Sequence, residues 1–286
     1  MIVPGSTSQA LAGALSAATG RPLARATYDR FPDGETLASV SGFDGDEAVV
    51  VAATTSNDAY VELLQLQDAV REAGAERVTT VLPYMGYSRQ DRAFKRGHPV
   101  SARAMARAVS TGTDRVVLVT PHEPTVADFF EVPCEVVDAA SLLADPLPAD
   151  LTDPLFLSPD QGAVELARTV RDGYGRGGAD YFEKRRDYDS GEVTVDDGGA
   201  GALGDGRDVV LTDDMIATGS TMSEAVAHLR AAADPAGVYV ACVHPLLVAD
   251  ARTKLEAAGL DGIWGTDTVE CDVSAVSVAP LVADAL

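Results

Sequence analysis

The sequence predicts an α/β fold of the open, doubly wound kind, divided into two domains. Short, almost continuously apolar runs alternate with amphipathic stretches along the whole chain, which is typical of parallel sheets covered by helices on both faces. The chain has 286 residues, which is long for a single hydrophobic core. Prolines and aspartates interrupt both patterns at 142–154, so we expect the domains to meet near there.

The individual elements follow from this alternation. Apolar, β-branched runs predict strands at 48–53, 77–83, 115–120, 155–158, 208–212 and 238–243. Helical periodicity predicts helices at 58–73, 101–110, 163–170 and 221–233. The glycine-rich segment 196–207 precedes a strand and is interpreted as a loop between strands. Each side of the boundary therefore holds several strand–helix units.

The charge of the chain excludes two classes of function. There are 44 acidic against 22 basic residues, a formal net charge of −22, and a protein that binds nucleic acid or an anionic membrane needs the opposite sign. An acidic, solvated surface adapted to a salt-rich cytoplasm is the plain interpretation. No run approaches the roughly 18 apolar residues of a membrane span, and the N-terminus lacks the features of a signal peptide. We expect a cytoplasmic protein.

The three cysteines, Cys134, Cys242 and Cys271, are scattered without the spacing of a metal site. We expect them to be reduced core residues of an intracellular protein.

Two short segments reverse the overall charge. Residues 89–107 contain six basic side chains and a single acid, and residues 183–186 form a smaller basic cluster. Basic residues concentrated in so acidic a chain favour the binding of an anionic ligand. A solvated, basic helix face is the alternative for the first cluster, and a solvated basic tip for the second.

The segment VVLTDDMIATGST, residues 209–221, combines an apolar strand, a polar turn and the start of a helix. Small residues allow backbone N–H groups to approach a phosphate at the positive end of a helix, and Thr221 with Glu224 has the spacing of a capping box. Asp213 and Asp214 lie where the strand ends, and their carboxylates accept hydrogen bonds from hydroxyl groups. A sugar phosphate fits both parts of the segment, with its phosphate at the turn and its hydroxyls at the two carboxylates. A simple strand–turn–helix junction is the alternative.

One motif matches a known fingerprint but lacks its structural context. GYGRGG at 173–178 satisfies the glycine pattern of a dinucleotide fingerprint, but it follows a helical pattern and precedes a strand-like segment. That fingerprint requires the reverse order, so we interpret the segment as a loop that ends a helix. The chain also lacks a Walker-type phosphate loop.

Eight motifs, in order, resemble those of ribose-phosphate pyrophosphokinases, over nearly the whole chain. They are RFPDGE (30–35), TSNDAYVELLQLQDAVREAGA (55–75), VLPYMGYSRQDR (81–92), PVSARAMA (99–106), TPHEPTVADFF (120–130), LSPDQGAVELA (157–167), FEKRR (182–186) and LTDDMIATGSTM (211–222). The resemblance implies two tandem type I phosphoribosyltransferase-like domains, each a mostly parallel sheet flanked by helices: residues 1–145 on the ATP side and 146–286 with the ribose 5-phosphate site. It also implies that the last helix packs on the N-terminal domain.

The implied reaction transfers the diphosphoryl group of Mg-ATP to the 1-hydroxyl of ribose 5-phosphate, giving 5-phosphoribosyl 1-diphosphate and AMP for nucleotide biosynthesis. The resemblance assigns ribose 5-phosphate to Asp213, Asp214, Thr218, Gly219, Ser220 and Thr221. Ala217 occupies a position where many members have another aspartate, so no role is assigned to it.

For ATP, the resemblance assigns the phosphates to the segment with Arg89, Gln90 and Arg92. It assigns the adenine to Phe31, Asp33 and Glu35 of a neighbouring subunit, which implies a homo-oligomer, at least a dimer. Without the resemblance, residues 31–35 are interpreted as a simple β-turn, because Asp-Gly favours turns.

The resemblance assigns Mg²⁺ to His122 and Asp160, and charge stabilisation during transfer to Lys184 and Arg186, at the start of a catalytic loop at about 184–196. Two alternatives stay open: a phosphoribosyltransferase that consumes phosphoribosyl diphosphate, and a catalytically silent regulatory homologue.

Overall fold

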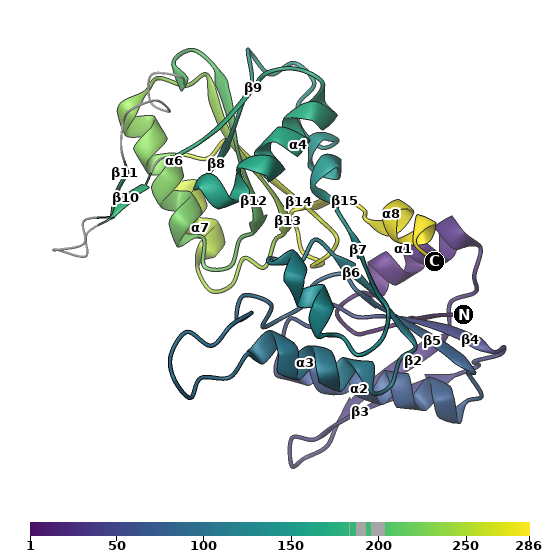
Figure 1. The fold of residues 1–286 in the computed structure, drawn as a ribbon. Helices are drawn as coiled ribbons and strands as arrows, with labels where there is room; N and C mark the ends of the chain where they lie inside the picture. Colours follow the sequence, from purple (N-terminus) through teal and green to yellow (C-terminus); the bar gives the residue numbers. More distant parts are fainter. Residues whose placement is uncertain (183, 187–192, 196–203) are drawn as a thin grey trace. The chain divides into compact units, whose positions relative to one another are not determined.

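The computed structural model describes residues 1–182, 184–186, 193–195 and 204–286, and the chain forms two compact units (Figure 1). Unit 1 comprises Met1–Ala139, Asp267–Glu270 and Ser277–Leu286. Unit 2 comprises Ala140–Thr266 and Cys271–Val276. The chain therefore returns to the first unit after completing most of the second. The domain limits 1–145 and 146–286 stay a prediction.

Unit 1 is built on a parallel sheet with the strand order β1-β4-β5-β6-β7. The strands are β1 (Ile2–Pro4), β4 (Glu47–Val51), β5 (Arg77–Leu82), β6 (Arg115–Val119) and β7 (Cys134–Val137). Because all of them run in the same direction, their carboxyl ends lie at one edge of the sheet. The segments that follow β4, β5 and β6 therefore begin side by side.

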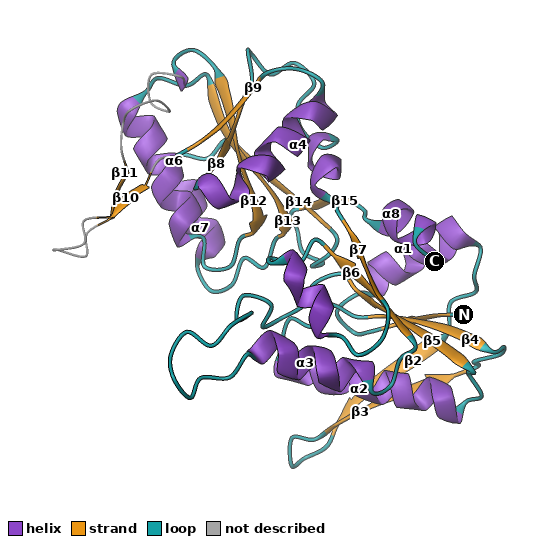
Figure 2. Cartoon of the chain, in the orientation of Figure 1, coloured by secondary structure: helices purple, strands orange, loops and turns teal. Residues whose placement is uncertain are grey.

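Helices cover this sheet on both sides (Figure 2). They are α1 (Gln9–Thr19), α2 (Asn57–Glu72), α3 (Ser101–Ser110) and α8 (Ala279–Asp284), with the 3-10 helix η1 (Pro124–Phe129). The apolar side chains of α2, among them Leu63, Leu66 and Val70, are buried in the core of the unit. Helix α8 contacts α1.

A β-hairpin, β2 (Arg25–Arg30) and β3 (Thr36–Ser41), extends from unit 1 and was not predicted. It packs on α2, where the side-chain amide of Gln65 accepts a hydrogen bond from Ala38 N (2.8 Å) and donates one to Thr36 O (2.8 Å). One face of the hairpin packs on the core of the unit through Ala26, Tyr28, Ala38 and Val40, and the other face is exposed. These apolar positions alternate with polar ones, but they are few and mostly small, so the runs were not identified as strands.

Unit 2 also contains a parallel sheet, with the order β15-β14-β13-β12-β8-β9. The strands are β8 (Leu155–Ser158), β9 (Gly178–Tyr181), β12 (Asp208–Met215), β13 (Gly237–His244), β14 (Gly262–Thr266) and β15 (Ser274–Val276). After β8 the chain continues to β9 on one side and then returns to place β12 on the other. The strand order thus reverses between β8 and β12, where doubly wound sheets bind their ligands.

The helical elements of unit 2 are η2 (Ala140–Ala144), η3 (Gln161–Ala163), α4 (Val164–Tyr174), α6 (Ser220–Ala232) and α7 (Ala251–Ala257). Strands β10 (Lys184–Arg186) and β11 (Val193–Val195) form a separate antiparallel pair. Met222, Val226 and Leu229 of α6 are buried against the sheet.

All six predicted strands and all four predicted helices are present. Two parallel sheets flanked by helices confirm the predicted fold class. The GYGRGG segment, residues 173–178, ends α4 and leads into β9, so its interpretation as a loop that ends a helix is also confirmed. Cys134, Cys242 and Cys271 are free thiols. Among the described residues, no helix has both the length and the apolar character that crossing a membrane requires.

Candidate functional site

The strongest candidate site lies at the carboxyl ends of β8 and β12, where the strand order of unit 2 reverses. Asp213 and Asp214 lie near the end of β12, and Asp160 follows β8. Asp160 caps η3, since its Oδ1 accepts a hydrogen bond from Gly162 N (2.9 Å). Three carboxylates thus lie at the carboxyl ends of the two strands that flank the switch point, the region for which the sequence predicted a sugar and a metal ion.

The electrostatics of Asp213 are unusual. Burial, followed by the charge of Asp214, raises the pKa of Asp213 to about 8, and the charge of Asp160 adds to this rise. A hydrogen bond from Asp214 N to Asp213 Oδ1 (2.9 Å) opposes it. Near neutral pH this carboxyl can be protonated and donate a hydrogen bond to a ligand hydroxyl, or be ionised and accept one. A cation at the site would favour the ionised form.

The turn after β12 leads directly into α6. Gly219 is the N-cap residue with a positive φ of 70°, and its carbonyl accepts a hydrogen bond from Ser223 N (2.8 Å). The Thr218 hydroxyl donates to the Ser220 hydroxyl at 3.4 Å. The turn thus presents hydroxyl groups beside the first backbone N–H groups of a 13-residue helix, which is the arrangement that binds phosphate.

The predicted capping box of Thr221 and Glu224 is wrong. The helix begins at Ser220, and its N-cap, Gly219, makes no side-chain hydrogen bond to the helix. Thr221 therefore lies inside the first turn, where it is exposed. A cap formed by glycine leaves the helix terminus open, which suits an anion better than a capping side chain does.

Backbone hydrogen bonds fix this turn to the rest of unit 2. Ile216 N donates to His244 O (3.1 Å), Leu247 N to Ile216 O (2.9 Å) and Val248 N to Ala217 O (3.0 Å). Ala217 thus takes part in the turn through its backbone.

The predicted ATP-phosphate segment follows β5 in unit 1. Arg89 and Arg92 are exposed, and the guanidinium of Arg92 lies 5.4 Å from the centre of the Phe94 ring. Of the six basic side chains in residues 89–107, only Arg107 forms an ion pair within the described part of the chain, with Glu131 at 3.3 Å. The cluster therefore presents basic groups to solvent that are not neutralised by carboxylates.

Gln90 has a different environment. Its Nε2 donates to Pro99 O (3.1 Å), and its Oε1 accepts from the Ser101 hydroxyl (2.7 Å). The side chain connects the loop to the start of α3, so its amide is already engaged within unit 1.

Residues 31–35 form the tip of the hairpin. Phe31 N donates to Glu35 O (2.8 Å), Gly34 N donates to Phe31 O (2.9 Å), and Gly34 has a φ of 95°. Asp33 Oδ1 accepts from Glu35 N at 3.1 Å. The segment is thus a turn, as its sequence alone predicts, and it also leaves Phe31 46% exposed. An exposed ring at a hairpin tip is available for stacking.

The remaining predicted residues are placed as follows. His122 is exposed and follows β6 in unit 1, whereas Asp160 belongs to unit 2, and a joint role for them stays a prediction. No group of three or more His, Cys, Asp or Glu side chains suited to a metal ion occurs among the described residues.

Lys184 and Arg186 lie in β10. Within the predicted catalytic loop, 187–192 and 196 lie outside the described residues.

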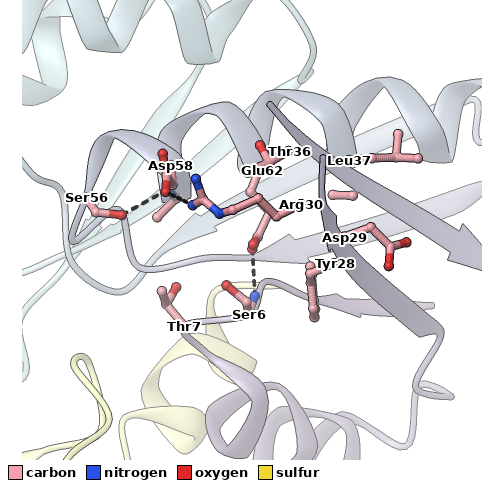
Figure 3. A pocket seen from close by; sticks show the side chains of 12 residues that line it. Ser6, Thr7, Tyr28, Asp29, Arg30, Thr36, Leu37, Ser56, Asp58 and Glu62 are labelled. Carbon is pink, nitrogen blue, oxygen red and sulfur yellow. Dashed lines mark hydrogen bonds and ion pairs between the residues drawn. The ribbon is translucent and has the colours of Figure 1, made fainter. Parts of the chain in front are cut away.

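Unit 1 also holds a pocket of about 280 Å³ that the sequence did not predict (Figure 3). It lies between the hairpin, the start of α2 and the segment after β1. Arg30 of the hairpin is paired with Asp58 of α2, and Glu62 Oε1 accepts from Ser6 N at 2.6 Å. Three distant segments contribute to it, so no local pattern could have revealed it.

Comparison with known proteins identifies the family. A family model described as the N-terminal domain of ribose phosphate pyrophosphokinase matches residues 1–112, and one described as a phosphoribosyl transferase domain matches residues 136–273. A ribose-phosphate pyrophosphokinase of Halobacterium salinarum is 59% identical over 287 residues and covers 100% of both chains. The enzyme of that name from Methanosarcina mazei is 39% identical, covering 100% of this chain and 94% of its own.

The fold agrees with a solved structure. The phosphoribosylpyrophosphate synthetase of Mycobacterium smegmatis matches with a TM-score of 0.82 and 29% identity, over 100% of this chain and 96% of that one. Halobacterium salinarum is a halophile, in agreement with the salt adaptation that the acidic composition predicts. The chain belongs to the ribose-phosphate pyrophosphokinase family.

Proposed function

We propose that the protein transfers the β,γ-diphosphoryl group of Mg-ATP to the 1-hydroxyl of ribose 5-phosphate, giving 5-phosphoribosyl 1-diphosphate and AMP in the cytoplasm. The observation that carries this proposal is the site at the strand-order reversal of unit 2. There Asp213 and Asp214 lie directly before a turn that opens the N-terminus of α6. Carboxylates and an open helix terminus together fit a ligand that has both a diol and a phosphate.

Ribose 5-phosphate occupies this site in the proposal. Its phosphate accepts hydrogen bonds from the turn, through the backbone and hydroxyl groups of Thr218, Gly219, Ser220 and Thr221. Its ring hydroxyls face Asp213 and Asp214. Binding both ends of the sugar fixes the direction of the 1-hydroxyl, which lowers the entropic cost of the reaction.

ATP is assigned to unit 1. Arg89 and Arg92 are exposed and unneutralised by carboxylates in the described chain, and guanidinium groups suit bidentate contacts to phosphate. The engagement of Gln90 with Pro99 and Ser101 supports a role in shaping the loop beside its assigned role in binding. Phe31, Asp33 and Glu35 reach the adenine of a neighbouring subunit in this proposal, which makes the protein a homo-oligomer.

Mg²⁺ is assigned to Asp160 and His122. Oxygen donors are the ligands that Mg²⁺ prefers, and a divalent cation would relieve the repulsion that Asp214 and Asp160 exert on Asp213. Bound there, the ion would neutralise charge on the phosphates of ATP. The imidazole of His122 is the less usual ligand of the two.

Lys184 and Arg186 are assigned to the transition state. Transfer of a diphosphoryl group needs positioning and positive charge more than covalent help from the protein. Two cations on one short strand, β10, supply that charge to the oxygens of the transferred group.

A direct assay tests the proposal. The chain is incubated with ATP, Mg²⁺ and ribose 5-phosphate, and AMP and 5-phosphoribosyl 1-diphosphate are quantified in low-salt and in high-salt buffer. Equal amounts of both products are expected. The absence of AMP in both buffers would contradict the proposal, and it is the result that a phosphoribosyltransferase or a silent homologue would give.

A further inference from the structure

The segment that carries the proposed ATP-binding arginines is fixed at its start to the loop that follows β4 (Glu47–Val51). Thr54 is 1% exposed, and its N–H and hydroxyl both donate to Tyr84 O, at 2.9 and 3.1 Å. The same hydroxyl accepts a hydrogen bond from Gly86 N at 3.0 Å. A Cβ at Gly86 would lie 2.3 Å from Thr54 O, so only glycine permits this close approach.

Helix α2 holds the same point from the other side. Tyr60 is 5% exposed, and its hydroxyl donates to Gly86 O at 2.7 Å. Burial raises the pKa of Tyr60, so the hydroxyl stays protonated and remains a donor over the physiological range. Both backbone groups of Gly86 are therefore bound, one by Thr54 and the other by Tyr60.

The next residue turns the chain outward. Tyr87 has a φ of 63°, a left-handed conformation that costs about 1 kcal/mol for a residue other than glycine. Its hydroxyl donates to Asn57 Oδ1 at 2.6 Å, and its ring lies 6.0 Å from the ring of Tyr60. The first turn of α2 thus stabilises the unusual backbone at Tyr87.

These contacts determine the position of Arg89. Gln90 N donates to Tyr87 O at 3.0 Å and closes a turn, within which Ser88 is buried and Arg89 is exposed. The far end of this turn is tied to α3, since Ala102 N donates to Gln90 O at 3.2 Å. Arg89 is therefore presented to solvent from between two anchored points.

We propose that Tyr60 is a positioning residue for ATP: by holding the Gly86 carbonyl, it fixes the turn from which Arg89 reaches the triphosphate. The inference rests on the proposed function. It assigns to the first turn of α2 a role in nucleotide affinity, although Tyr60 itself is buried and does not touch the substrate.

The test is Tyr60→Phe, which removes one hydroxyl and keeps the ring. Loss of one buried hydrogen bond to the turn is expected to raise the KM for ATP about five- to tenfold. The KM for ribose 5-phosphate and kcat are expected to stay within about twofold, because those depend on unit 2 and on Lys184 and Arg186. A structural defect alone would lower the active fraction and leave both KM values unchanged.

Tyr174→Phe is the matched control. The Tyr174 hydroxyl also donates to a backbone carbonyl, Pro148 O at 2.6 Å, but in unit 2. The same hydroxyl also accepts from Leu151 N at 3.3 Å, so this variant removes at least as many contacts as Tyr60→Phe, and its KM for ATP is expected to equal that of the unmodified chain.

Tyr87→Phe provides an independent check, because it releases the turn at Asn57 and leaves Tyr60 intact. It is expected to raise the KM for ATP in the same direction, and its effect combined with Tyr60→Phe should be less than the product of the two.

The proposal is overturned if Tyr60→Phe leaves the KM for ATP within twofold, changes both KM values equally, or behaves as Tyr174→Phe does. If the unmodified chain forms no AMP, the proposed function fails. Calorimetric titration of the same variants with ATP then decides the positioning role separately.

Discussion

The side chain of Glu270 accepts a hydrogen bond from Leu11 N at 2.9 Å, so a residue near the end of the chain caps a helix near its beginning. Ser8 is the N-cap residue of α1 but makes no side-chain hydrogen bond to the helix, because its hydroxyl accepts from Ala53 N at 2.9 Å. Leu11 occupies the position whose N–H a capping side chain normally binds. Glu270 therefore replaces the missing local cap and adds a negative charge at the positive helix end.

Glu270→Ala is expected to destabilise the folded chain by about 1–2 kcal/mol, because it removes both the hydrogen bond and the charge at the start of α1. Denaturant unfolding at constant salt measures this loss. Glu270→Gln keeps an acceptor and should lose about half as much. Glu256→Ala, which removes an exposed ion pair with Arg252 on α7, is the control and should cost less than about 0.5 kcal/mol. Equal losses for Glu270→Ala and Glu256→Ala would contradict the capping role.

Stability should also depend on pH through Asp213. Its pKa rises from the ordinary value of 3.8 to about 8 on folding, so the folded chain binds an extra proton between these values. Stability is therefore lost as pH rises from about 4 to about 8. Asp213→Asn removes the charge and should stabilise the ligand-free chain at pH 8, by on the order of 2 kcal/mol after allowing for partial exposure, or roughly 4–8 °C in Tm.

Thermal unfolding at pH 5 and pH 8, without divalent cations or substrates, checks this expectation. The gain from Asp213→Asn should be much smaller at pH 5 than at pH 8. Asp145→Asn is the control, because Asp145 is exposed and forms no ion pair among the described residues. A gain that is the same at both pH values would show that Asp213 is not strained by its charge. The variant should also lose affinity for ribose 5-phosphate, since stability and binding make opposite demands on this residue.

Much of the fold was predictable because its strands are short, apolar and buried. Val49 to Val51 and Val116 to Val119 are almost completely buried, so a continuous apolar run identifies them. The hairpin at 25–41 was not predicted, because its inward-facing residues are few and mostly small, and its link to α2 through Gln65 joins distant segments. The cap of α1 could not be predicted from the sequence either, since it joins residues that are 259 positions apart.

In the candidate site, too, features formed by one continuous segment were predictable, and features formed by contacts between distant segments were not. The turn at Thr218–Thr221 could be placed because one continuous segment supplies the strand end, the small residues and the helix start. The start of α6 was misjudged, because the spacing of Thr221 and Glu224 favours a capping box, while the left-handed backbone of Gly219 begins the helix earlier. The anchoring of Gly86 by Tyr60 depends on packing between α2 and the end of β5, which no local pattern encodes.

Lys184→Ala is expected to lower kcat by about 100-fold or more while both KM values stay within a few-fold, because a cation that acts on the transferring group stabilises the transition state more than bound substrate. Steady-state kinetics with each substrate varied in turn measures both parameters. Lys254→Ala, on α7 and paired with Asp250 at 2.9 Å, is the control and should leave kcat unchanged. A variant with a raised KM and an unchanged kcat would place Lys184 in substrate binding alone.

Gly219 offers a test of the phosphate-binding turn with an internal control. Gly219 and Gly206 have nearly the same backbone, with φ values of 70° and 68°, so replacing either with alanine costs about 1 kcal/mol in left-handed strain. Their surroundings differ. A Cβ at Gly219 would lie 3.2 Å from Ala251 O and 3.3 Å from Ala251 Cα, whereas a Cβ at Gly206 meets nothing within 4 Å. In Gly219→Ala, either the turn or the start of α7 must therefore move by a few tenths of an ångström.

We expect both variants to lose similar stability from strain, with a further loss in Gly219→Ala from crowding at Ala251. Only Gly219→Ala should raise the KM for ribose 5-phosphate, by about tenfold, which corresponds to roughly 1.4 kcal/mol of binding energy. The KM for ATP should stay within twofold in both, because unit 1 is unchanged. If Gly206→Ala weakened the binding of ribose 5-phosphate to the same extent, general strain in unit 2 would explain the loss of affinity. An unchanged affinity in Gly219→Ala would contradict the assignment of the phosphate to this turn, because left-handed strain and crowding at Ala251 both act on the residue that caps α6.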